Sequence, residues 1–141
     1  MAFTQNKEPT FPLQPQASRV QIVNADAQAY KVGYTAGANG SKIFGVIATS
    51  SDTSNRDIAI VITNSAVNYV LGMKTVPLSS GIVAGTPSVN LIDTTTIPGL
   101  PVDNDGNPFI YLISGDTLTF QAQTSVTAAK IISIHVFAAD F

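Results

Sequence analysis

Residues 41–63 constrain the fold more than any other stretch of the chain. They form two apolar runs of strand length, separated by a polar break at residues 50–55. Side chains alternate between the two faces of a strand, and the second run is apolar on both. One face carries Ile58, Ile60 and Ile62, and the other carries Ala59 and Val61. Strands of this kind lie in the middle of a two-layer structure or under a neighbouring subunit.

The rest of the chain repeats short apolar alternations separated by turn residues, and no segment has convincing helical periodicity. Further strands are expected at residues 18–24, 29–35, 67–76, 89–93, 109–113, 117–124 and 130–141. Gly72 falls inside one of them and suggests a β-bulge. Many short strands at regular spacing predict an all-β fold, an antiparallel β-sandwich or barrel, with a jelly roll or Greek key as the leading arrangement.

The 141 residues predict one domain at 18–141, preceded by an extended proline-rich N-terminal arm at 1–17. The arm is interpreted either as a disordered tail or as a segment that docks on a neighbour. A second irregular stretch, residues 77–108, is long enough to suggest a partner. Seven apolar residues of these two segments are the predicted partner-binding residues. They are Phe3, Phe11, Leu13, Ile82, Val83, Ile97 and Leu100.

Charged residues make up 11% of the chain, against about 25% in ordinary soluble domains. Part of the surface is therefore expected to be covered by other protein. The net charge of −2 gives no electrostatic case for binding nucleic acid or an anionic membrane. The apolar runs are too short to span a bilayer, and the first residues do not resemble a secretion signal, so a chain made in the cytoplasm is expected.

Catalytic and metal-binding patterns are weak. His135 is the only histidine, there is no cysteine, and no Gly-x-Ser-x-Gly motif surrounds a serine. Residues 103–107, Asp-Asn-Asp-Gly-Asn, could offer oxygen ligands to a cation, but they depart from the EF-hand pattern and are interpreted as a turn. Two carboxylate pairs, Asp52 with Asp57 and Asp93 with Asp116, could in principle serve glycoside hydrolysis, but the sequence does not give the separation that this chemistry requires. We therefore predict a protein that is not an enzyme and has no cofactor and no metal site.

Aromatic side chains on predicted strands could line a sugar-binding face. The candidates are Tyr30, Tyr34, Tyr69 and Tyr111. Core packing or cross-strand pairing is the simpler interpretation of tyrosines at strand positions.

Several segments together resemble small virion proteins of tailed bacteriophages. They are residues 40–52, 56–63, 89–93, 100–108 and the closing Ala138-Ala139-Asp140-Phe141, and the resemblance spans residues 18–141. It implies a capsid decoration protein, located in the virion, that binds the major capsid protein as a homotrimer. The arm and the 77–108 stretch would then contact the capsid. A neck or tail component and a carbohydrate-binding module on a virion surface are the alternatives.

Overall fold

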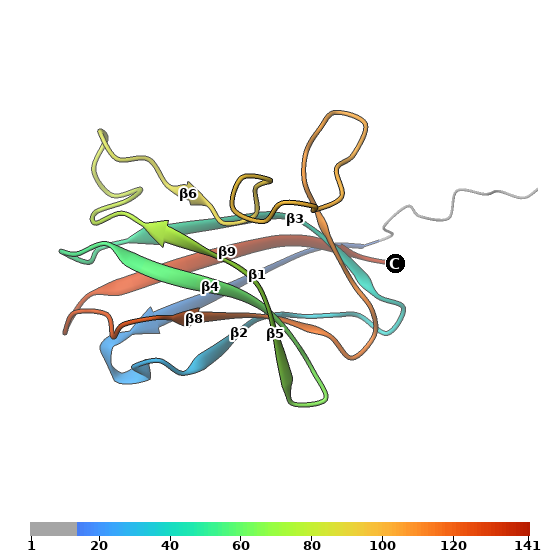
Figure 1. Cartoon of the computed structure of the whole chain (residues 1–141), viewed down its shortest axis with the longest axis horizontal. Helices are drawn as coiled ribbons and strands as arrows, with labels where there is room; N and C mark the ends of the chain where they lie inside the picture. The colour runs from blue at the N-terminus through green and yellow to red at the C-terminus, as the bar shows by residue number, and fades with distance from the viewer. Residues whose placement is uncertain (1–13) are drawn as a thin grey trace, which may run out of the picture.

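The computed structural model describes residues 14–141, which form two antiparallel β-sheets packed face to face (Figure 1). The strands are β1 (Gln14–Val23), β2 (Tyr30–Thr35), β3 (Ser41–Ser50), β4 (Arg56–Asn64), β5 (Val67–Val76), β6 (Val89–Asn90), β7 (Ile110–Leu112), β8 (Thr117–Ala122) and β9 (Ile131–Asp140). A single 3₁₀ turn, η1 (Asn24–Asp26), follows β1. The predicted all-β sandwich is confirmed. No helix in this part of the chain is long and apolar enough to cross a membrane.

The strand order is that of a jelly roll. Sheet A has the order β1-β9-β3-β6, with the short β7 pairing to the same edge of β3 as β6, and sheet B has the order β2-β8-β4-β5. The chain passes from one sheet to the other at every connection except those between β4 and β5 and between β6 and β7. Within residues 14–141, only β4 and β5 are joined as a tight hairpin in one sheet.

The two apolar strands of residues 41–63 lie in opposite sheets, because the loop between β3 and β4 crosses from sheet A to sheet B. Each is central in its sheet: β3 pairs with β9 and with β6 and β7, and β4 pairs with β8 and β5. This position explains why neither face of these strands is strongly polar. At the N-terminal edge, β1 begins at Gln14, four residues before the predicted strand. Pro15 is tolerated there because β1 is an edge strand.

The core fills the space between the sheets. Its largest fully buried side chains are Phe120, Ile22, Ile43, Ile58, Ile60, Leu91, Ile92, Leu112, Leu118, Ile132, Ile134 and Val46. The irregular 77–108 stretch contributes to this core, since Leu91, Ile92 and Ile97 are buried in it and Leu100 packs against it. Ile97 and Leu100, predicted as partner-binding residues, therefore belong to the packing of the fold.

The β4–β5 hairpin turns at Ser65 and Ala66, which both have positive φ (51° and 66°). Two left-handed residues are what a two-residue hairpin loop of this type requires. Asparagine and glycine usually occupy these positions, so the hairpin is built on residues that adopt this backbone at a cost.

Candidate functional site

The outer face of sheet B, the face that points away from the core, carries apolar side chains on three of its four strands, β2, β4 and β5. The strand register aligns two rows across it: Val32–Thr119–Val61–Val70 and Tyr30–Gln121–Ala59–Met73. We refer to these eight residues as the sheet B face. On the central strands Thr119, Val61 and Ala59 are buried and Gln121 is partly buried, whereas Val32, Val70 and Met73 on the edge strands are 55%, 59% and 48% exposed.

Two glycines decide which side chains reach the sheet B face. The register of β2 shifts between Val32 and Tyr34, so Gly33 is an extra residue, and Tyr34 turns into the core instead of following Val32 outward. A Cβ on Gly33 would lie 2.9 Å from Cδ2 of Phe120 and closer still to Cε2, which leaves room only for glycine. A β-bulge redirects side chains in this way.

The bulge predicted at Gly72 is confirmed, because Ile60 pairs with Gly72 while Val61 pairs with Val70. The bulge changes the faces of β5. Strict alternation would have grouped Met73 with Val67, Tyr69 and Leu71, whereas the register aligns Val70 and Met73 with the outward residues of β4.

The polar side chains of the sheet B face are already paired within the domain. Thr119 Oγ1 lies 3.1 Å from Thr63 Oγ1 and 3.3 Å from Thr117 Oγ1. The Gln121 amide donates to the carbonyl of Gln28 at 2.9 Å and accepts from Gln123 Nε2 at 3.0 Å. Covering this face with another apolar surface would thus leave few hydrogen-bonding groups without partners.

The outer face of sheet A is mixed. Phe44, Ile47 and Phe137 are exposed on it, and cations lie among them. His135 on β9 is half-buried between Arg19 of β1 and Ile47 of β3. Lys42 Nζ lies 4.4 Å from the centroid of the Phe109 ring, in a cation–π contact. Arg19 and Lys42 thus place positive charge beside the aromatic side chains of this face.

A shallow groove of about 610 Å³ separates the 81–88 loop from sheet A, and its lining includes Ile47, Thr49, Ile82 and Val83. Ile82 and Val83 are exposed there, and their predicted partner-binding role stays a prediction. The other predicted partner-binding residues, Phe3, Phe11 and Leu13, lie outside the described residues.

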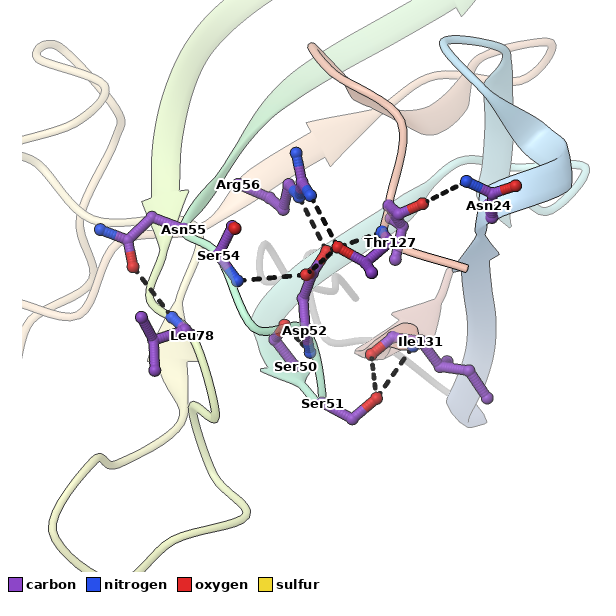
Figure 2. A network of polar contacts seen from close by, with 11 residues as sticks. Asn24, Ser50, Ser51, Asp52, Ser54, Asn55, Arg56, Leu78, Thr127 and Ile131 are labelled. Atoms are coloured by element: carbon purple, nitrogen blue, oxygen red, sulfur yellow. Dashed lines mark hydrogen bonds and ion pairs between the residues drawn. The ribbon is translucent and has the colours of Figure 1, made fainter. Parts of the chain in front are cut away.

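A buried polar cluster around Asp52 connects the β3–β4 loop with the β8–β9 loop, where the chain crosses between the sheets. Figure 2 shows Arg56 and Thr127 converging on Asp52. Asp52 is fully buried and accepts from Arg56 Nε (2.7 Å), Thr127 Oγ1 (2.6 Å), Thr127 N (3.1 Å) and Ser54 N (3.1 Å). Burial pushes the pKa of Asp52 upward, but the hydrogen bonds from Arg56 and Thr127 outweigh it and hold that pKa well below its usual value.

A second polar cluster connects the two sheets at the opposite end of the sandwich. Asp140 Oδ1 on β9 accepts from the hydroxyls of Tyr34 (2.5 Å) and Ser41 (2.6 Å). Burial and the hydrogen bond to Asp140 raise the pKa of Tyr34 to about 12. Tyr34 comes from sheet B and the other two from sheet A, so this cluster also links the sheets.

The predicted candidates for chemistry do not converge. Asp57 accepts from Thr75 at 2.5 Å, Asp93 pairs with Lys74, and Asp116 accepts from Asn64 at 2.7 Å. Each of these three carboxylates, like Asp52, is therefore bonded to a different neighbouring side chain. The 103–107 segment is the predicted turn, since Asp103 Oδ1 accepts the backbone N–H of residues 105 and 107. Among residues 14–141, no group of three or more His, Cys, Asp or Glu is placed to hold a metal ion.

The tyrosines do not form one platform. Tyr34 is in the core, Tyr30 lies on the sheet B face, and Tyr69 is exposed on the edge strand β5. Tyr111 lies in the other sheet, where it pairs with Lys42 and stacks edge-on against Phe109, with centroids 4.8 Å apart.

No family model matches the chain, and no curated protein matches it. The fold is similar to the crystal structure of the Drosophila NLP core, which is described for its pentamer formation and histone binding. The likeness covers 91% of this chain and 100% of that one, with 12% sequence identity and a TM-score of 0.47. At this level it assigns neither histones nor a pentamer to the present chain.

The capsid decoration function implied by the resemblance is wrong on these comparisons. The similar structure named above, the Drosophila NLP core, is described for pentamer formation and histone binding and not as a virion protein. That function is therefore withdrawn, together with its neck or tail and carbohydrate-binding alternatives. The capsid partner and the virion location came from the same resemblance and stay untested predictions.

Proposed function

We propose that this chain is an assembly domain, which acts by associating with further copies of itself and carries out no catalysis. The observation that carries the proposal is the placement of its apolar side chains. Val32, Val70 and Met73 are about half exposed on sheet B, as are Phe44 on sheet A and Ile82 beside it. Exposed apolar surfaces of this kind mark protein interaction sites.

The scarcity of charge supports the same proposal. Only 11% of the residues are charged, and several of these charges are used inside the domain, as in the pairs Asp52–Arg56, Asp26–Lys31 and Asp93–Lys74. A free monomer normally keeps itself soluble with many interspersed surface charges. A surface this neutral suits a molecule that is covered by protein.

The arrangement of the carboxylates supports a role without catalysis. A general acid or base needs a partner group and a perturbed pKa in a cleft. Asp52 and Asp93 do have displaced pKa values, but both are lowered, and each carboxylate is held in a local hydrogen-bond network. That is the pattern of structural ion pairs.

The number of copies is a separate matter from association itself. The homotrimer implied by the resemblance stays a prediction. Light scattering and native mass spectrometry of the full chain, over a wide dilution series, measure the number directly. We expect species larger than the monomer that persist in high salt, because apolar contacts are not screened by ions. A monomer at every concentration, or association lost in high salt, would contradict the proposal.

A further inference from the structure

We infer that the groove between the 81–88 loop and sheet A binds residues 11–13 of a second copy of this chain. The inference rests on the proposed function and specifies the contact that it uses. One copy supplies the residues ahead of its β1 and the other supplies the groove, so the contact is head-to-tail. The groove, a polar hollow beside it and the reach of the N-terminal residues support this assignment.

The groove is uncharged and has apolar area left to bury. Its lining comes from β3 and the 81–88 loop and contains no charged residue. Ile82 and Val83 are 59% and 53% exposed, and Ile47 on the floor is 37% exposed. Covering these side chains with other apolar side chains removes that area from water, which is the main favourable term in most protein association. The groove therefore suits an apolar segment without charge.

A polar hollow of about 330 Å³ adjoins the groove. Its lining includes one cation, Lys42, and one carboxylate, Asp103, together with Asn90. Asn90 pairs in register with Ile47, which lines the groove, so the two hollows are neighbours along β3. Figure 1 shows the 81–88 loop and the 101–108 segment projecting on the same side of the sandwich, beyond β3. Together the hollows form one path for a segment that is apolar at one end and charged at the other.

The residues just ahead of β1 supply the apolar end, and their reach selects a second copy. Phe11 and Leu13 flank a proline and lie three residues and one residue before Gln14. Ile47 lies two strands across from Arg19, which is five residues further along β1 than Gln14. The groove is therefore about 20 Å from Gln14, whereas the backbone of residues 11–13 extends at most about 10 Å from it. These two side chains cannot reach the groove of their own chain, but they can enter that of a neighbour.

The charged residues ahead of this segment match the polar hollow. Residues 1–13 carry one cation and one carboxylate in their side chains, Lys7 and Glu8. Glu8 stands five residues before Leu13, which is the spacing that separates Lys42 from Ile47 on β3. A segment that lies along β3 with Leu13 in the groove therefore brings Glu8 beside Lys42, which takes part in none of the three ion pairs of residues 14–141. The adjacent Lys7 then lies toward the carboxylate of the same hollow, so opposite charges meet and fix the register.

The test compares the wild-type chain with two double variants by sedimentation velocity over a dilution series. The groove variant is Ile82→Glu with Val83→Glu, and the N-terminal variant is Phe11→Glu with Leu13→Glu. Each should raise the dissociation constant of the assembly by about a hundredfold or more, because carboxylates replace both apolar contacts on one side. The N-terminal variant makes this test without changing any residue of the 14–141 domain.

The matched control is Val70→Glu with Met73→Glu, which adds the same charge at exposed positions of the edge strand β5. The control should associate like the wild type, and circular dichroism checks that every variant keeps the fold.

Mixing the two double variants completes the test. The N-terminal variant keeps an intact groove and the groove variant keeps intact residues 11–13, so each pair of chains can make one contact. We expect a one-to-one dimer that does not grow further on concentration. The inference is overturned if the wild type associates and either double variant associates as tightly, if the mixture stays monomeric, or if the control dissociates. A wild type that is monomeric throughout instead refutes the proposed function itself.

Discussion

The buried pair of Asp52 and Arg56 gives the sharpest stability prediction. We expect Asp52→Asn to lower the free energy of unfolding by about 3 kcal/mol, the low end of the range for breaking a buried ion pair. The low end applies because the Arg56 side chain is still 15% exposed. Asparagine keeps the size of the side chain but presents an NH₂ group to donors and leaves the guanidinium without its counter-charge.

The size of the effect on melting follows from the length of the chain. Unfolding entropy of about 2.1 cal/mol/K per residue, over 141 residues, gives about 0.3 kcal/mol/K. A loss of about 3 kcal/mol then lowers Tm by about 10 °C. Urea unfolding followed by circular dichroism measures the free energy, and a thermal scan measures Tm. Asp105→Asn, at an exposed loop position, is the control and should change stability by less than about 0.5 kcal/mol.

The pH dependence of the same variant checks the cause. The folded-state pKa of Asp52 is held below its usual value, so its contribution is complete above the unfolded value of about 3.9. The contribution is lost as the pH falls through the folded pKa. The stability difference between wild type and Asp52→Asn should therefore be constant near neutral pH and shrink below about pH 4. Equal stability of the two proteins at pH 7 would refute the assignment of a stabilising ion pair.

Two further predictions concern backbone geometry. Gly33→Ala should destabilise by about 1–3 kcal/mol, because the added methyl overlaps the Phe120 ring, whereas Gly85→Ala, with nothing within 4 Å of its Cβ, should be close to neutral in the same urea titration. Ala66→Gly should stabilise by about 0.5–1 kcal/mol, since relief of the left-handed backbone exceeds the entropy that glycine adds to the unfolded chain. Ala128→Gly, at a turn residue without positive φ, should have the opposite sign, and a destabilising Ala66→Gly would contradict the strain argument.

Alternation of apolar residues was sufficient to predict the strands and the sandwich. The pattern at residues 41–63 predicted two strands in the middle of a two-layer structure or under a neighbouring subunit, and both strands are central in their sheets. It could not assign them to opposite sheets, because a loop of this length can close a hairpin or cross between layers. The strand order is fixed by contacts between distant segments, such as Gln14 with Asp140, which leave no local signal.

The surfaces were harder to predict because single residues reverse the alternation. Gly72 was predicted as a bulge, yet its effect on Val70 and Met73 depends on which residue is the extra one. The sequence around Gly33 did not indicate a bulge, so simple alternation placed Tyr34 on the same face of the strand as Tyr30. Ile97 resembled an exposed loop residue because only the folded chain shows that it reaches the core. The low charge predicts a surface covered by protein, which stays a prediction, and it does not indicate which sheet would make the contact.

The position of β9 has a consequence for the synthesis of the protein. β9 is the innermost partner of sheet A and pairs with β1 on one side and β3 on the other. Until Ile131–Asp140 has left the ribosome, β1 has no strand beside it and β3 has only the short β6 and β7 on its other edge. Until then their backbone edges and apolar side chains are open to wrong partners. Completion of the sandwich is therefore a late event, and the nascent chain is most vulnerable to aggregation just before its final strand emerges.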